Sequence, residues 1–158
     1  MSNKAEKELC KAALLTFEDL GFMFPEPELE EENPLVEPEA SVSVEFWGPF
    51  SGRLVVTVCG GLLPALAANM LGEEAPPSEL QQCDALGEIS NVICGNVLPA
   101  IAGSKAVFHI GAPQRLQNPE TPDRGSPEAK VHLALDQGRA DLFLFIDKAV
   151  SCLEEQPQ

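Results

Sequence analysis

Residues 78–103, SELQQCDALGEISNVICGNVLPAIAG, form the longest stretch of the chain with a clear helical period. Ser78 follows two prolines and precedes Gln81 by three residues, which is the spacing of a capping box at a helix N-terminus. Gly103, followed by polar residues, is a suitable C-terminal stop. The stretch therefore predicts one long helix around which the rest of the chain is organised.

The predicted helix has two coherent faces. At about 100° per residue, its apolar residues fall within one arc of roughly 80°, and this expected buried stripe consists of Leu86, Ile89, Ile93, Val97 and Ala100. The other side carries small, polar and acidic residues, namely Asp84, Glu88, Asn91 and Gly95.

The polar side is costly for a helix. Asn91 gains nothing at mid-helix by itself, and Gly95 costs about 1 kcal/mol relative to alanine. Glu88 and Asn91 are three residues apart, so their side chains project side by side. The pattern indicates that another group approaches this face closely. The alternative is a solvated face with a kink near Pro99, where the missing N–H favours a bend.

The run from residue 84 to residue 96, DALGEISNVICGN, resembles the signature helix of the chemotaxis phosphatases CheC, CheX and FliY. That signature reads Gly-Glu-x-x-Asn, followed by small residues and Gly-Asn. Five residues match it as they stand: Gly87, Glu88, Asn91, Gly95 and Asn96. CheC-like proteins resemble a duplication with two such motifs, and this chain offers one helical copy, so it is more similar to CheX.

The resemblance implies a phosphatase that acts on the phospho-aspartate of a CheY-like response regulator. It implies that Asn91 positions the attacking water and that Glu88 pairs with a lysine of the regulator. Asp84, Gly87 and Gly95 are then expected on the partner-binding face. The chain needs no cofactor or metal of its own, because the magnesium ion is expected in the regulator. A homodimer is expected from the family alone.

A second hypothesis assumes the same fold without catalytic activity. Under this hypothesis the protein is a non-catalytic binding or structural component of chemotaxis or flagellar-switch signalling. A metal or nucleotide enzyme is a weaker third possibility, because the sequence contains no P-loop, no dinucleotide-binding glycine fingerprint and no cluster of metal ligands.

The composition and charge of the chain limit the kinds of binding partner that it can have. The chain has 158 residues and a formal net charge of −15, which argues against a nucleic-acid partner and against anionic membrane surfaces. No stretch approaches the roughly 20 consecutive apolar residues of a membrane span, and the charged N-terminus does not resemble a signal peptide. We therefore expect a cytoplasmic protein with one domain over residues 1–158.

The five cysteines are odd in number and include no C-x-x-C pair. Their neighbours are mostly apolar, which favours buried free thiols. His109 and His132 both fall in predicted strands and are expected to be half-exposed there. Neither residue type indicates a nucleophile pair or a zinc site.

The remaining elements follow in order along the chain. Helices are predicted at 3–20, with Asn3 as the N-cap, and at 62–71. Alternating or β-branched runs predict strands at 41–47, 53–59, 106–110, 130–135 and 140–146. An acidic, proline-rich connector occupies residues 24–40 and a long loop occupies 111–128. Gly138 is expected at a positive φ in a hairpin turn.

This order predicts an α+β fold, an antiparallel sheet with two or three helices packed on one face.

Overall fold

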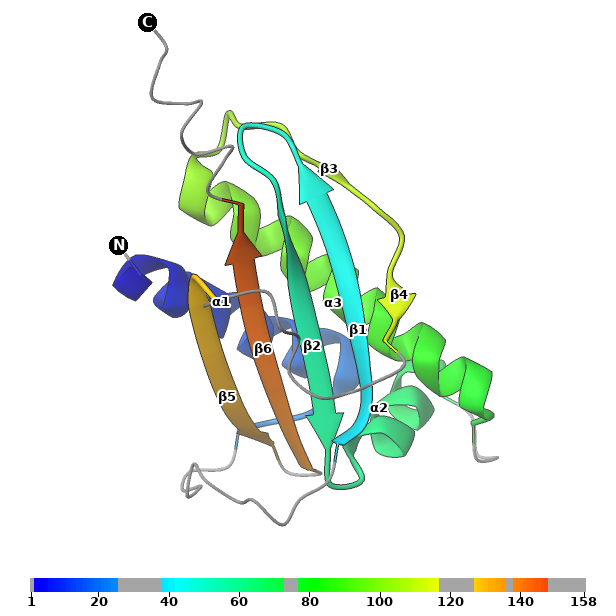
Figure 1. Ribbon diagram of the computed structural model, residues 1–158. Coiled ribbons are helices and arrows are strands. Elements are labelled where there is room, and N and C mark those ends of the chain that lie inside the picture. Colours follow the sequence, from blue (N-terminus) through cyan, green and yellow to red (C-terminus); the bar gives the residue numbers. More distant parts are fainter. Residues whose placement is uncertain (1, 26–37, 73–76, 117–126, 136–137, 148–158) are drawn as a thin grey trace, which may run out of the picture.

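A computed structural model describes residues 2–25, 38–72, 77–116, 127–135 and 138–147 of the chain. One antiparallel sheet is covered on one face by three helices, as Figure 1 shows. The predicted fold class is therefore confirmed. In chain order the elements are α1 (Ser2–Gly21), β1 (Pro38–Trp47), β2 (Gly52–Cys59), α2 (Leu62–Leu71), α3 (Glu79–Ala102), β3 (His109–Ile110), β4 (Gln114–Arg115), β5 (Ala129–Leu135) and β6 (Gly138–Ile146).

The sheet is built from two hairpins laid side by side. Its strand order is β3-β1-β2-β6-β5, and β4 pairs with β1 beside β3. Alternate residues of each long strand face the helices, as the period of two dictates. On β1 these residues are Val42, Val44 and Phe46, all buried. The sequence pattern predicted this face correctly.

The region after α3 differs from the prediction. The expected strand at 106–110 is reduced to His109–Ile110, and a second short strand, Gln114–Arg115, lies inside the expected loop. Both pair with β1, through Phe46↔Ile110 and Val42↔Arg115 among others. Pro113 lies between them and has no N–H to continue the ladder. The segment therefore pairs with the sheet at its two ends.

The caps of α3 confirm its predicted boundaries. The Ser78 hydroxyl accepts a hydrogen bond from the Gln81 backbone N–H at 3.1 Å, and the Gln81 side chain accepts one from the Ser78 N–H at 2.8 Å. The Gly103 N–H closes the last turn onto the Pro99 carbonyl. Helix α1, in contrast, begins at Ser2, so Asn3 lies inside the helix and is not the N-cap that was expected.

Helix α3 packs against α1, α2 and β1 at the centre of the core. Four members of the predicted stripe, Leu86, Ile89, Ile93 and Val97, are fully buried. Ala100 is exposed, which corrects the prediction. The larger Leu98 is buried there instead and Ile101 packs against the core, since larger apolar side chains gain more from burial.

By length and hydropathy alone, α3 could cross a membrane, with a window of mean hydropathy 1.3. The prediction that no stretch of the chain approaches the length and hydropathy of a membrane span was therefore wrong. Half of that window is buried inside the fold. Packing of a core helix against the sheet accounts for this apolar composition.

Position 138 requires glycine because of close packing, and not because of the turn conformation that the sequence pattern predicted. It lies in β6, paired with Leu135, and its φ is not positive, so the predicted turn conformation was wrong. A Cβ atom there would lie 2.5 Å from the Cys59 carbonyl oxygen and 2.8 Å from the Leu62 Cβ. The backbone of the β2–α2 junction leaves no room for a side chain. The predicted connector 24–40 ends earlier than expected, because residues 38–40 belong to β1. Residues 26–37 of the connector and 117–126 of the long loop lie outside the described residues.

Candidate functional site

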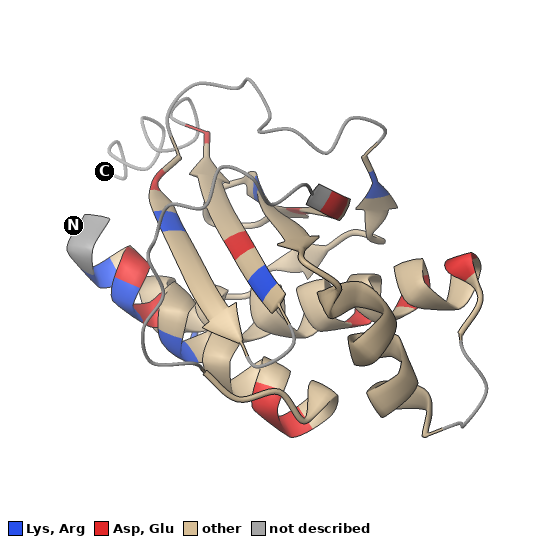
Figure 2. Cartoon of the chain, turned by 90° about the horizontal axis from the view of Figure 1, so that it is seen from below, with Lys and Arg blue, Asp and Glu red and all other residues tan. Residues whose placement is uncertain are grey.

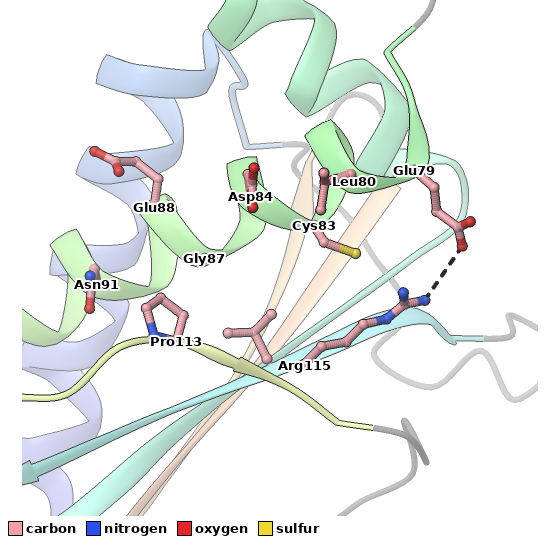
Figure 3. Close-up of a pocket in the computed structure, with 10 residues that line it drawn as sticks. Glu79, Leu80, Cys83, Asp84, Gly87, Glu88, Asn91, Pro113 and Arg115 are labelled. Carbon is pink, nitrogen blue, oxygen red and sulfur yellow. Dashed lines mark ion pairs between the residues drawn. The ribbon is translucent and has the colours of Figure 1, made fainter.

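A cleft of about 710 Å³ lies along the N-terminal half of α3. Its second wall is the segment 110–115, here called the strap, which joins β3 to β4 beside the helix (Figures 1 and 3). Helix α3 lines the cleft with Glu79, Leu80, Cys83, Asp84, Gly87, Glu88 and Asn91, and the facing wall consists of Val42, Pro113 and Arg115.

The structure brings together four of the five residues proposed from the sequence. Asp84, Gly87, Glu88 and Asn91 all line the cleft. Figure 3 shows the Asp84 and Glu88 carboxylates on the side of α3 away from Pro113, with Asn91 one turn further along and next to the Pro113 ring. Gly95 does not line the cleft, although it is exposed on the same helix.

Gly87 is in close contact with the strap. A Cβ atom on Gly87 would lie 3.1 Å from both the Cβ and the Cγ atoms of Pro113. The sequence indicated a close approach to this face of the helix. At Gly87 the approaching group belongs to the same chain. At Gly95 a Cβ atom would meet only Ile110 Cδ1, at 3.8 Å.

Asn91 is half-buried, and its Oδ1 atom is shielded from solvent. That oxygen has no hydrogen-bond partner among the described residues. An unpaired buried acceptor is costly, and such atoms deserve a functional explanation. Ser90, the neighbouring polar residue, is satisfied, because its hydroxyl donates to the Leu86 carbonyl at 2.8 Å.

The charge of the cleft is dominated by the helix. Helix α3 contains three acidic residues, Glu79, Asp84 and Glu88, and no basic one. Arg115 on β4 forms an ion pair with Glu79 at 3.7 Å, across the mouth of the cleft. Both side chains are more than half exposed, so this pair adds little stability. Figure 2 shows acidic but no basic residues along α3, whereas α1 carries residues of both charges.

Pro113 and Arg115 line the cleft, although the sequence pattern predicts only a long loop for them. No periodicity marks them, since β4 has two residues and a strand signal needs at least four. Their position follows from the pairing of β4 with β1, which only the assembled sheet shows.

The two histidines lie away from the cleft, whereas the Cys83 thiol lines it. His132 Nδ1 and Arg139 Nε contact the same Asp141 oxygen, at 2.6 and 3.0 Å, on neighbouring strands β5 and β6. His109 is exposed and stacks on Trp47. Both histidines lie in strands, as predicted.

The cysteine prediction is confirmed in part. Cys59 and Cys94 are buried free thiols, and burial raises their pKa values to about 11 and about 12. Cys10 and Cys83 are free and half-buried, and burial also raises the pKa of Cys10. Cys152 lies outside the described residues.

The fold and the cleft together define a class of α+β protein that presents a glutamate and an asparagine from one long core helix. The family model described as chemotaxis phosphatase CheX matches residues 40–136, from β1 through β5. This match covers more than half of the chain, and the protein belongs to the CheX family.

Solved structures share the fold at low sequence identity. Chemotaxis protein CheX from Desulfovibrio desulfuricans is similar with a TM-score of 0.72 and 19% identity, over 90% of this chain and 99% of that one. CheX from Vibrio vulnificus gives a TM-score of 0.69 and 18% identity, over 93% and 99% of the two chains.

A third similar structure is a complex of CheX and CheY with BeF3 and Mg²⁺ from Borrelia burgdorferi, with a TM-score of 0.62 and 17% identity over 89% and 96%. A search of curated proteins gave no match.

Proposed function

We propose that this protein hydrolyses the acyl phosphate of a phosphorylated CheY-like receiver domain. The observation that carries the proposal is the placement of Glu88 and Asn91, one helical turn apart, in an open cleft on the signature helix. Membership of the CheX family supports it. The similar fold of a CheX that was solved in complex with CheY supports the choice of partner.

Asn91 is proposed to position the attacking water. Phosphoryl transfer needs an in-line nucleophile and charge stabilisation more than covalent chemistry from the protein. The Asn91 amide offers one carbonyl acceptor and two N–H donors, so it can accept a hydrogen bond from the water while the amide stays neutral. A carboxylate at this position would repel the phosphoryl oxygens.

Glu88 is proposed to orient the complex. Its carboxylate is exposed beside Asn91 and has no ion-pair partner among the described residues. It can therefore pair with a lysine of the receiver domain when the helix enters the receiver's active site. The magnesium ion and the phospho-aspartate are expected in the receiver. This chain would position the attacking water and provide the surface on which the receiver docks. Asp84 and Gly87 extend the contact surface along the cleft.

The test is phosphate release from receiver domains phosphorylated by a small-molecule donor with magnesium. We expect wild type to accelerate release. Asn91→Ala and Asn91→Asp should both lower turnover by at least about 100-fold, and Glu88→Gln should mainly raise KM for the receiver. A matched control is Glu18→Gln, because Glu18 is an exposed glutamate of α1 outside the cleft. Turnover by Asn91→Ala at the wild-type rate would refute the proposal.

The same assay separates the second candidate function. A binding protein without catalysis should form a complex with a receiver or a switch component yet release no phosphate in any variant. Equilibrium binding of the receiver, measured beside phosphate release, distinguishes the two functions. We also propose the homodimer that the family suggests, which light scattering on the full chain tests.

A further inference from the structure

The strap and the signature helix run alongside each other. Ile110 approaches Gly95 and Pro113 approaches Gly87, as the space around the two glycines shows. The glycines are eight residues apart, about 12 Å along a helix axis. The two strap residues are three apart, up to about 10 Å in an extended chain. Asn91 lies midway between the two contacts, one turn from each glycine.

The strap passes beside Asn91, whose Oδ1 atom is buried. Gly87 and Asn91 lie on the same face of α3 because they are four residues apart. Pro113, which packs on Gly87, lines the cleft with Asn91, and Figure 3 shows its ring beside the Asn91 amide. The buried Oδ1 is the acceptor that the proposed mechanism needs for water.

The strap is hydrogen-bonded to β1 at both ends but not in its middle. The Gly111 N–H bonds the Glu45 carbonyl at 2.8 Å, and the Leu116 N–H bonds the Ser41 carbonyl at 2.9 Å. Arg115 adds the exposed ion pair with Glu79. Within the described part of the chain, no hydrogen bond is found for Ala112 or Pro113. The middle of the strap can therefore move off the helix without breaking the sheet.

We propose that the strap gates Asn91. In the closed position Pro113 packs on Gly87 and keeps the Asn91 carbonyl from solvent. Docking of the receiver domain displaces Ala112 and Pro113, and the carbonyl then accepts the hydrogen bond of the attacking water. Opening gives a partner to a buried acceptor that the closed state leaves unpaired, and this favours movement. The gate rests on the proposed phosphatase function and adds a means of control at the same site.

The experiment compares Pro113→Gly with Ala112→Gly. The first removes both atoms that cover Gly87, and the second adds similar backbone freedom but keeps the proline ring. Solvent access to the Asn91 side-chain amide is measured by NMR, as the relaxation that a neutral gadolinium chelate causes. The resonance is assigned by its loss in Asn91→Ala. Phosphate release from a phosphorylated receiver domain is measured in parallel.

A gate predicts a gain in both measurements. In Pro113→Gly the relaxation of the Asn91 amide should rise about twofold or more, and kcat/KM should rise about threefold or more, since a larger fraction of molecules is open. Ala112→Gly should stay close to wild type. Pro113→Gly combined with Asn91→Ala should show no turnover, because the gain passes through Asn91.

The outcomes separate the gate from the phosphatase. Unchanged relaxation in Pro113→Gly overturns the shielding and with it the gate. Raised relaxation with unchanged or lower kcat/KM in a folded variant overturns the gate but leaves the phosphatase intact. If wild type and Pro113→Gly both release no phosphate from any receiver, the proposed function fails, and the relaxation data alone decide whether the strap shields Asn91.

Discussion

Three glycines of this chain serve different purposes at the scale of single residues. Gly87 makes room for Pro113 and Gly138 makes room for the β2–α2 junction. Gly95 faces open space apart from one Ile110 methyl group. Glycine at position 95 therefore lowers helix stability without an internal packing need, which is consistent with a surface kept slim for a partner.

Alanine substitution separates these roles. Gly138→Ala should destabilise the fold by a few kcal/mol, about 2 or more, because its Cβ would meet backbone atoms. Gly95→Ala should stabilise it by about 1 kcal/mol, as helix propensity predicts. Urea unfolding of both variants measures the two free energies. Equal effects of the two substitutions would contradict the spatial interpretation, and weaker receiver binding by Gly95→Ala would support a partner contact there.

Asn91 shows the cost of function at a single residue. A buried acceptor without a partner costs about 1–3 kcal/mol, and asparagine is a poorer helix former than alanine. The Asn91→Ala variant should thus be at least as stable as wild type while it loses turnover. Such a pairing of lost activity and retained stability is the mark of a residue kept for its chemistry.

At the scale of elements, α3 depends on its N-terminal cap. The capping box satisfies two backbone groups at the start of the helix that lines the cleft. A helix whose first turn frays would move Glu79 and Leu80, which form the outer part of that cleft. The cap therefore links local stability to the shape of the site.

Ser78→Ala should lower the free energy of unfolding by about 1 kcal/mol, because the N-terminal N–H groups lose their acceptor. Ser104→Ala is the matched control, since Ser104 is an exposed serine just beyond the other end of α3. Urea unfolding compares the two variants. A loss of the same size in Ser104→Ala would show that the cap is not the cause.

The strands differ in how many residues pair with their neighbours in the sheet. The four long strands pair over seven or more residues, as the registers of β1–β2, β2–β6 and β5–β6 show. Strands β3 and β4 pair with β1 at two positions each. Few backbone bonds per residue allow local opening at low cost, and this is the property that the gate requires.

At the scale of the whole molecule, the helices and sheet enclose two buried thiols. Burial raises the pKa of Cys59 to about 11 and that of Cys94 to about 12, above the ordinary value of 9.0. Above pH 9 the unfolded chain loses these protons and the folded chain keeps them. Stability should therefore be complete below pH 9 and fall as the pH rises towards 11–12.

The Cys94→Ala variant tests this dependence. The variant should be less stable than wild type at neutral pH because of the lost packing. Between pH 9 and 11 the free energy of unfolding should fall less steeply in the variant than in wild type. The two slopes should differ by about 1.4 kcal/mol per pH unit, the contribution of one thiol. Urea unfolding in the presence of a reductant gives both slopes. Parallel curves for wild type and variant would show that the Cys94 thiol does not titrate as its burial requires.

The sequence by itself determined the elements that local physics controls. The capping box, the apolar stripe of α3, the bounds of α2 and the alternation of β1 follow from hydrogen bonds and side-chain spacing within a few residues. These signals also placed Asp84, Gly87, Glu88 and Asn91 on one helix. Asn3 and Ala100 were misplaced near helix ends, where local signals are weakest.

Only the tertiary structure decided how distant segments meet. The contact of Gly87 with Pro113 and the close approach of Cys59 to Gly138 each join parts of the chain that lie more than 20 residues apart. No local period encodes them, because they arise when β3 and β4 add to the edge of β1 and bring the strap against α3. The helix face was therefore readable from the sequence, and the wall that covers it was not.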